Sequence, residues 1–297
     1  MVRCANGTQS TESWSSLEMC ASSRSDGNLV RLMNEVLSLA HREYGSAVPD
    51  KPSVVLLHPF PFDRRMWQQV APSLASAGWH VIVPDLRGCG ESALGASEPD
   101  IAVLAHDVWA LLDDLQISRP VVLGVSLGGY VTMAMLRSRP SGLTGIGLID
   151  TKATSDHPEA QLQRRAVAHH MRTEADVRAF ADAMVPRLIS DTTVLEHPEV
   201  AAVIHEWILQ TEPLTIAWLQ EAMAGRPDSV ADLTSFSGAA LLLRGSEDVV
   251  CSEADYEVMQ LALNNATYVE IEGCGHLPPI ENSQATIAAV ASWLDCI

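Results

Sequence analysis

A serine between closely spaced glycines is the residue of this chain best placed for nucleophilic chemistry. The segment Gly124-Val125-Ser126-Leu127-Gly128-Gly129 follows an apolar run that predicts a strand, and it opens a predicted helix. Its glycines permit a sharp turn that lifts the Ser126 hydroxyl above the sheet edge. The N-terminus of the helix can stabilise negative charge there. The pattern therefore predicts a nucleophile elbow with Ser126 as the nucleophile.

Other glycine-rich turns compete with this interpretation. A dinucleotide-binding fingerprint needs glycine where Ser126 stands, and a phosphate-binding loop needs Gly-Lys-Ser/Thr, which this segment lacks. An ordinary turn between a strand and a helix is the structural alternative. A base and an acid elsewhere in the chain would favour catalysis, because a serine hydroxyl is a weak nucleophile at neutral pH without them.

A candidate base and a candidate acid follow later predicted strands. Asp248 ends the segment 244–248, and His276 ends the segment 273–276. Both segments leave the carboxyl edge of the sheet, as Ser126 does, so the three side chains are expected to converge. Asp150 also ends a strand at this edge. We favour Asp248 as the acid, because the following strand and helix lead directly to His276, and we expect Asp150 to bind nearby backbone N–H groups.

These residues need a sheet that brings the ends of its strands together. Short apolar runs alternate with helical spacing along the chain, which is typical of βαβ units and of a parallel sheet buried on both faces. Strands are predicted at 54–57, 81–83, 121–123, 145–149, 239–243 and 267–271, with helices at 66–74, 101–115, 127–138, 254–263 and 283–294. The predicted fold class is α/β, with a mostly parallel sheet flanked by helices.

The alternation stops between residues 151 and 232, where no strand is predicted. Helices are predicted over 164–172, 175–188, 201–210 and 214–224, separated by Pro158, Pro186, Pro198, Pro213 and Pro227. We interpret 151–232 as a helical cap inserted into an α/β core of residues 28–150 and 233–297. Residues 1–27 are rich in Ser, Thr, Asn and Gly and are predicted to form a flexible tail.

The composition and net charge of the chain limit the kinds of partner that it is expected to bind. Of its 297 residues, 47% are hydrophobic and 19% are charged, which is enough apolar material for a full core. The net charge of −18 repels phosphate backbones and anionic lipids, so we expect no nucleic acid and no membrane as a partner. No run reaches the ~18 apolar residues of a spanning helix, and residues 1–27 lack the apolar core of a signal peptide. We therefore predict a soluble, cytoplasmic protein, and the sequence leaves a homo-oligomer open.

The cysteines and histidines do not predict a metal, a cofactor or a disulfide. No CxxC pair occurs, and the chain is too long to need disulfides, so we predict free thiols at Cys4, Cys20, Cys89, Cys251, Cys274 and Cys296. Cys89, Cys251 and Cys274 fall in loops that can meet near the site, where we interpret them as small buried thiols rather than a redox-sensitive group. The pair His169-His170 has no further ligand at helical spacing, and no HExxH motif is present.

Several segments together resemble the α/β-hydrolase fold family, from about residue 35 to the C-terminus. His58-Pro59-Phe60-Pro61 is similar to that family's HGxP loop, residues 85–92 to its DxRGxGxS turn, and residues 275–281 to its histidine loop. Asp248 lies in a segment similar to the family's acid loop, although Cys251-Ser252 stands where a proline is common. Within the family, residues 60–67 and 150–151 resemble the group of enol-lactonases, small carboxylesterases and cofactor-free haloperoxidases.

The resemblance implies an oxyanion hole made by two backbone N–H groups. They belong to Leu127, just after the nucleophile, and to Phe60, after a dipeptide that is His-Gly in the family and His58-Pro59 here. Proline has no N–H, but the required donor belongs to Phe60, so the hole is retained while the loop becomes stiffer.

Other conspicuous residues are expected to have structural roles. His58 is expected to brace the oxyanion loop by hydrogen bonds, and Asp85, Arg87 and Glu281 are expected to fix turns. Five apolar residues of the cap are expected to cover an apolar pocket, namely Met171, Met184, Trp207, Trp218 and Met223. The alternative is that they form the core of the cap itself.

The predicted function is a serine hydrolase that cleaves a small carboxylic ester or lactone through an acyl-enzyme on Ser126. His276 would take the hydroxyl proton, and Asp248 would orient the imidazole. Dehalogenases and epoxide hydrolases of this fold use aspartate at the elbow, so Ser126 argues against both. Two alternatives stay open: a cofactor-free haloperoxidase or lyase with the same triad, and a non-catalytic ligand-binding member of the fold.

Overall fold

The computed structural model describes residues 36–297, and its centre is one seven-stranded sheet. The strand order is β1-β3-β2-β4-β5-β6-β7, and every neighbouring pair is parallel except β1 with β3. The strands are β1 (His41–Tyr44), β2 (Val54–Leu57), β3 (Val81–Pro84), β4 (Val121–Val125), β5 (Gly145–Ile149), β6 (Ala239–Gly245) and β7 (Ala266–Ile271). The prediction of a mostly parallel α/β sheet is confirmed.

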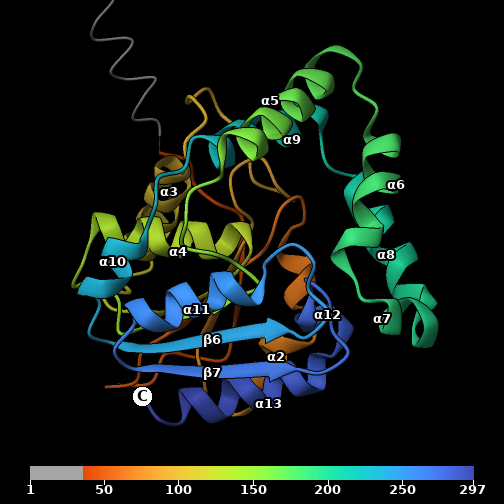
Figure 1. Cartoon of the computed structure of the whole chain (residues 1–297). Helices are drawn as coiled ribbons and strands as arrows, with labels where there is room; N and C mark the ends of the chain where they lie inside the picture. The colour runs from red at the N-terminus through yellow and green to blue at the C-terminus, as the bar shows by residue number, and fades with distance from the viewer. Residues whose placement is uncertain (1–35) are drawn as a thin grey trace, which may run out of the picture.

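Helices cover both faces of the sheet (Figure 1). Successive strand residues pack into two separate cores. Val55 and Leu57 of β2 pack toward α3 (Ile101–Asp114), α4 (Leu127–Ser138) and α11 (Glu253–Ala262). Val54 and Leu56 pack toward α2 (Val70–Ser76) and α13 (Ser283–Leu294) on the other face. This alternation arises because successive side chains of a strand point to opposite faces. All residues of β2 to β5 are buried, which explains their unbroken apolar runs.

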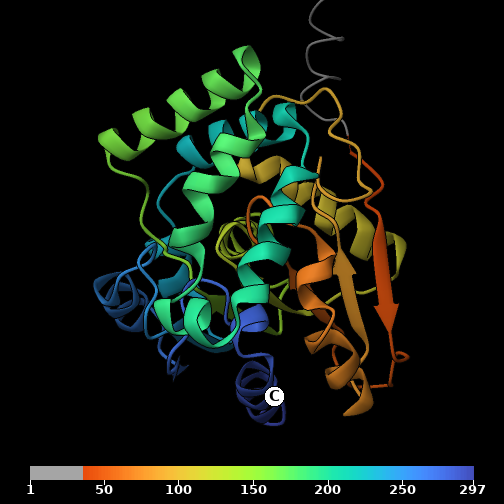
Figure 2. The ribbon, with the colours of Figure 1, turned by 90° about the vertical axis from the view of Figure 1, so that its right-hand side faces the viewer.

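Between β5 and β6 the chain forms helices only. They are α5 (Pro158–Thr173), α6 (Val177–Leu188), α7 (Asp191–Glu196), α8 (Pro198–Leu209), α9 (Pro213–Ala224) and α10 (Val230–Ser235). Helix α5 packs on α9, and α6 packs on α8 (Figure 2). Helices α6, α7 and α8 stand beyond the tips of the β6 and β7 arrows in Figure 1. This segment therefore lies at the carboxyl edge of the sheet, where the predicted site residues are expected.

Several short elements differ from the sequence prediction. Strand β1, the short helices α7 and α10, and helix α12 (Pro278–Glu281) were not predicted. The helix predicted over 66–74 is divided into the 3-10 helix η1 (Arg64–Trp67) and α2. Pro186 lies inside the last turn of α6 and therefore does not separate two helices as predicted. Each of the other three prolines begins a helix, where its missing N–H is tolerated; these are Pro158, Pro198 and Pro213. The expected boundary at residue 232 falls inside α10, which packs on α4 and α11.

Some expectations fall on residues that are not described. The predicted tail 1–27, Cys4 and Cys20 lie outside residues 36–297. Within those residues, no helix combines the length and apolar character needed to cross a membrane. Cytoplasmic localisation stays a prediction.

A buried ion pair holds the segment that follows β3 against α3. Arg87 Nε donates to Asp107 Oδ2 at 2.7 Å and its Nη2 donates to Oδ1 at 2.9 Å, and both side chains are buried. Asp107 Oδ1 also accepts the Leu37 N–H at 3.0 Å. The expected turn-fixing role of Arg87 is confirmed by these bonds and by its donation to the Leu94 carbonyl.

Removing one partner of this pair is expected to destabilise the protein strongly. Asp107→Asn removes the negative charge that accepts two hydrogen bonds from the buried Arg87 guanidinium, so we expect the free energy of unfolding to fall by about 3 to 5 kcal/mol in urea titration. The matched control is Asp113→Asn on the same helix, because the Arg139–Asp113 pair is about half exposed. That change should alter the free energy of unfolding by less than about 1 kcal/mol. Equal losses in the two variants would contradict a stabilising role for the buried pair.

Candidate active site

Ser126 occupies a sharp turn between β4 and α4. Its φ of 51° and ψ of −109° lie outside the ordinary regions for a residue with a Cβ, and its N–H donates to the Ile149 carbonyl at 2.9 Å. The neighbouring glycines are needed for close approach. A Cβ on Gly124 would lie 2.1 Å from the Gly128 carbonyl carbon, and a Cβ on Gly128 would lie 2.4 Å from the Leu57 carbonyl oxygen. The sequence therefore folds into the strand, turn and helix predicted around Ser126.

His276 and Asp248 form a buried hydrogen-bonded pair at the ends of β7 and β6. The distance from His276 Nδ1 to Asp248 Oδ2 is 3.0 Å, and both side chains are almost fully buried. Asp248 also accepts the N–H groups of Val250 at 2.7 Å and Cys251 at 3.3 Å. Burial opposes the charged form of Asp248, but the charge and hydrogen bond of His276 outweigh it and lower the pKa of this carboxyl. The carboxylate is thus ionised next to the imidazole.

Ser126 and His276 face the same cavity, which has a volume of about 380 Å³ and also exposes Phe60. This volume lies near the lower end of the range for small-molecule pockets. Within residues 36–297 the Ser126 hydroxyl makes no hydrogen bond, so it is available to turn toward the imidazole or toward a ligand. The structure thus brings Ser126, His276 and, through His276, Asp248 to one place.

The loop that follows β2 holds Phe60 at the edge of this cavity. The Phe60 N–H has no acceptor within residues 36–297, and Leu127 is the first residue of α4, so its N–H has no acceptor within the helix. His58 braces the loop as expected, because its Nδ1 donates to the Pro59 carbonyl at 3.0 Å and its Nε2 accepts the Leu86 N–H at 2.9 Å. Burial lowers the pKa of His58, which favours this neutral form.

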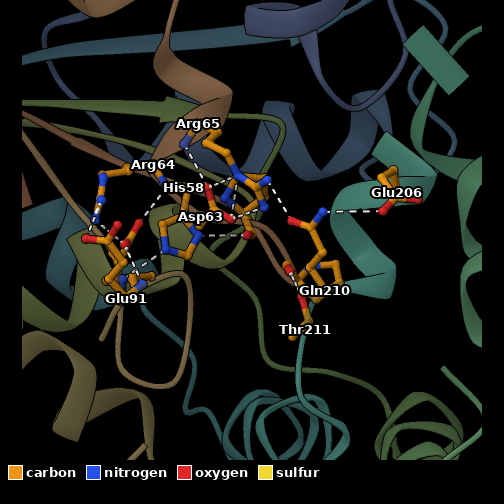
Figure 3. Close-up of polar contacts among 12 residues, drawn as sticks. His58, Asp63, Arg64, Arg65, Glu91, Glu206, Gln210 and Thr211 are labelled. Atoms are coloured by element: carbon orange, nitrogen blue, oxygen red, sulfur yellow. Dashed lines mark hydrogen bonds and ion pairs between the residues drawn. The ribbon is translucent and has the colours of Figure 1, made fainter. Parts of the chain in front are cut away.

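A polar network connects the same loop to the helical segment (Figure 3). Arg65 binds Asp63 at 2.6 Å and donates to Gln210 Oε1 at 2.7 Å, just beyond the end of α8. Thr211 Oγ1 donates to the Pro61 carbonyl at 2.8 Å. On the other side of the loop, Arg64 pairs with Asp85 and with Glu91, so Asp85 fixes its turn as expected. The loop is therefore held between the β3 turn and α8.

Glu281 fixes the backbone on both sides of His276. Its carboxylate accepts the N–H groups of Gly275 and Leu277, each at 2.9 Å, and that of Ser190 at 2.8 Å. The His276 N–H donates to the Leu188 carbonyl at the end of α6. The expected turn-fixing role of Glu281 is confirmed, and its contacts extend to the helical segment.

Asp150 lies against Asp248 rather than against His276. Its Oδ1 accepts the Gly245 N–H at 3.0 Å, so it binds a backbone N–H as expected. Its Oδ2 has no donor among the described residues and is fully buried. Burial, and then the Asp248 charge, raise the pKa of Asp150 well above its usual range. A proton on Asp150 gives its Oδ2 a hydrogen bond to Asp248, which two carboxylates could not form.

The described cysteines are free thiols, as predicted. Cys89, Cys251 and Cys274 are buried, and burial raises the pKa of each thiol, which agrees with their interpretation as small buried groups. The ligand atoms of Asp248, Cys251 and His276 lie within 4.8 Å of one another. Two of these residues already share the hydrogen bond between His276 Nδ1 and Asp248 Oδ2.

The cavity wall combines apolar and charged side chains, and only part of it was predicted. Met184 and Met223 line it as expected. By contrast, Met171 and Trp218 are buried in the core, and Trp207 packs edge-on against Phe62. Sequence reasoning missed the other polar residues of the wall, which are Tyr130, Lys152, Asp156, Gln163, Arg164, Arg187 and Gln220. The four-residue spacing of Lys152 and Asp156 is the only local signal, and it does not show which way the side chains point.

A mostly parallel sheet with a serine on a sharp turn after β4, and with a paired aspartate and histidine after β6 and β7, is the arrangement typical of the α/β-hydrolase fold. The family model described as alpha/beta hydrolase fold matches residues 52–283. The chain therefore belongs to the alpha/beta hydrolase fold family.

Relatives include esterases and enol-lactonases. A thermophilic esterase from Thermogutta terrifontis, solved with malate bound, is 36% identical with a TM-score of 0.83, and the match covers 88% of this chain and 94% of that one. The enol-lactonase from Burkholderia xenovorans is 28% identical with a TM-score of 0.79, covering 87% and 97% of the two chains. The 3-oxoadipate enol-lactonase 2 of Acinetobacter baylyi is 25% identical, covering 86% of this chain and 92% of that protein.

Proposed function

We propose that this chain is a serine hydrolase of small carboxylic esters or lactones, with Ser126 as nucleophile, His276 as base and Asp248 as acid. One observation carries the proposal: Ser126 faces the same cavity as an imidazole whose far nitrogen, Nδ1, is held by a buried carboxylate. That arrangement leaves His276 Nε2 to take the serine proton. The esterase and enol-lactonase relatives support the same class of reaction.

The proposed reaction passes through an acyl-enzyme. Ser126 Oγ forms a bond to the carbonyl carbon while its proton moves to His276 Nε2, and the carbonyl oxygen becomes an oxyanion. When the tetrahedral intermediate collapses, the bond to the leaving oxygen breaks and that oxygen takes the proton from His276. Water then attacks the acyl group with His276 as base again, which releases the acid and restores Ser126. Asp248 stabilises the imidazolium in both steps.

The oxyanion is proposed to bind the N–H groups of Phe60 and Leu127. Among residues 36–297 neither N–H group has an acceptor, so both can donate to a developing charge. The connections of the Phe60 loop to β3 and α8 would keep its donor in place during the reaction. The Leu127 N–H lies at the positive end of α4, which adds to the stabilisation.

The helices between β5 and β6 are proposed to act as a cap over the reaction site. Side chains of α5, α6 and α9 supply Arg164, Met184 and Met223 to the cavity wall. Excluding water at the oxyanion strengthens the interactions that stabilise it. The partner of the site is thus a small-molecule ester or lactone.

Covalent labelling tests the proposal directly. A serine-directed organophosphonate should modify the chain once, at Ser126, because only this hydroxyl is proposed to have a base beside it. His276→Ala should suppress labelling, while His169→Ala, on an exposed part of α5, should not. Peptide mass mapping identifies the modified residue.

The same preparation is assayed with p-nitrophenyl esters of graded chain length and with a panel of small lactones. Labelling at another serine would show that Ser126 is not the nucleophile. Absence of both labelling and turnover in folded protein would favour a non-catalytic, ligand-binding role.

A further inference from the structure

One carboxylate in the cavity wall is shared by three cations. Asp156 Oδ2 accepts Arg164 Nε at 2.6 Å and lies 2.9 Å from Arg226 Nη1, while its Oδ1 lies 3.3 Å from Lys152 Nζ. The Asp156 side chain is 1% exposed. Burial opposes its charge, but the two arginines outweigh burial and lower the pKa of this carboxyl, so it stays ionised. Three cations against one carboxylate leave a surplus of two positive charges beside the cavity.

Arg226 alone is enough to neutralise Asp156. It is buried, donates to the carbonyls of Met223 at 3.2 Å and Thr154 at 2.8 Å, and stacks on the ring of Tyr130 at 4.1 Å. A buried carboxylate with one such partner is already paired. The other two cations are therefore not required to balance its charge.

Lys152 and Arg164 differ from Arg226 because they face the cavity and keep unused donors. Their side chains are 22% and 23% exposed, and both residues line the cavity. Within residues 36–297, the Lys152 ammonium group makes no hydrogen bond, and Arg164 uses only Nε and Nη1, the latter toward Gln220 and Met223. An ammonium group and a guanidinium nitrogen are thus available to an acceptor inside the cavity.

This cationic pair lines the same cavity as the proposed nucleophile. Lys152 follows Thr151, whose Oγ1 donates to the Ser126 carbonyl at 2.9 Å. Arg187 also lines the cavity and is exposed, whereas Asp156 is the only acidic residue among the described residues that line it. A protein with a net charge of −18 therefore presents a locally positive surface where a substrate would sit.

We propose that Lys152 and Arg164 bind a carboxylate of the substrate, so that the ester or lactone carries an ionised carboxyl group in addition to the bond that is cleaved. The proposal rests on the proposed function and adds a substrate class to it. A carboxylate matches the available donors because it accepts charge-assisted hydrogen bonds from both an ammonium group and a guanidinium group. It also balances the positive surplus beside Asp156.

A pair of matched esters tests the substrate class. The p-nitrophenyl monoester of adipate and p-nitrophenyl hexanoate have the same chain length and differ by a carboxylate in place of a methyl group. We expect kcat/KM to favour the charged ester by at least about tenfold. In Lys152→Met and Arg164→Met, the ratio of the two kcat/KM values should fall by roughly 10- to 100-fold. Arg172→Gln is the control, because it removes one charge from α5 outside the cavity wall, where Arg172 pairs with Glu221.

A binding measurement separates this proposal from the proposed reaction. Adipate is titrated calorimetrically into Ser126→Ala and into the double variants Ser126→Ala/Lys152→Met and Ser126→Ala/Arg172→Gln. We expect Kd to rise by at least about tenfold with the Lys152 change and to stay the same with the Arg172 change.

The outcomes distinguish the two proposals. Equal turnover of both esters by the wild-type chain would overturn the carboxylate site and leave the hydrolase in place. If neither of these esters is cleaved, and none of the graded esters and lactones of the earlier assay is cleaved either, the proposed function fails, and Lys152-dependent adipate binding would still support the site. Absence of adipate binding to Ser126→Ala would overturn it.

Discussion

Ser126→Ala should reduce ester turnover by several powers of ten, on the order of 10⁴- to 10⁶-fold in kcat/KM. The change removes the oxygen atom that forms the acyl bond in the proposed reaction. Among the described residues that line the cavity, Ser126 is the only serine, and His276 is the only histidine, held by Asp248. The fold should persist. Alanine keeps the Cβ that Ser126 already accommodates at a φ of 51°, so the backbone of the turn is not altered.

Rate and stability must be measured on the same preparations. Initial rates with a p-nitrophenyl ester give kcat/KM, and thermal melting followed by circular dichroism reports the fold. Ser73→Ala is a suitable control, because Ser73 is partly exposed on α2 and its hydroxyl donates to the Gln69 carbonyl. That variant should keep the wild-type rate. A folded Ser126→Ala protein that retains a tenth of the wild-type rate would remove Ser126 from the mechanism.

Asp248→Asn should lower turnover by about 10⁴-fold, the loss that the same change produces in a serine-protease triad. The asparagine amide can donate toward His276 Nδ1, which reverses the hydrogen bond at 3.0 Å and stabilises the wrong imidazole tautomer. Asparagine is nearly isosteric with aspartate, so packing around this buried position is retained. Turnover should therefore collapse with little change in melting temperature.

Asp150→Asn provides the matched comparison. Asp150 carries a raised pKa, so the amide replaces a neutral carboxyl group, can still accept the Gly245 N–H, and can donate toward Asp248 as the proton does. We expect this variant to alter stability or substrate range more than rate, with kcat/KM within about tenfold of the wild-type value. The two variants are compared side by side by kinetics and thermal melting. The reverse pattern would place the acid at Asp150.

The positions of the main strands and helices could be predicted from the sequence because their signals are local. Val54–Leu57 and Gly145–Ile149 are continuous apolar runs, and the structure makes them fully buried strands. Helix α4 begins directly after Ser126, where the glycine pattern placed it. Strand β1 carries no such pattern: it is a short strand at the edge of the sheet with charged residues, so its pairing with β3 depends on a neighbour distant in sequence.

Parts of the candidate site were predictable for a related reason. In a parallel sheet, segments that follow the strands lie at one edge, so Ser126, Asp248 and His276 were expected to meet. The structure pairs Asp248 with His276 and places Ser126 and His276 on one cavity. Their catalytic roles stay a prediction until the variants above are measured.

The sequence by itself determined the α/β class, the turn at Ser126 and the edge at which the three residues gather, because periodicity and strand direction are properties of short segments. Only the tertiary structure decided that Asp150 lies against Asp248, that Glu281 holds the backbone around His276, and that Asp156 gathers three cations. Each of these depends on the direction of a side chain and on the burial of its partners. Those quantities are set by how segments that are distant in the sequence pack together, and charges far apart in the sequence interact strongly only when that packing excludes water.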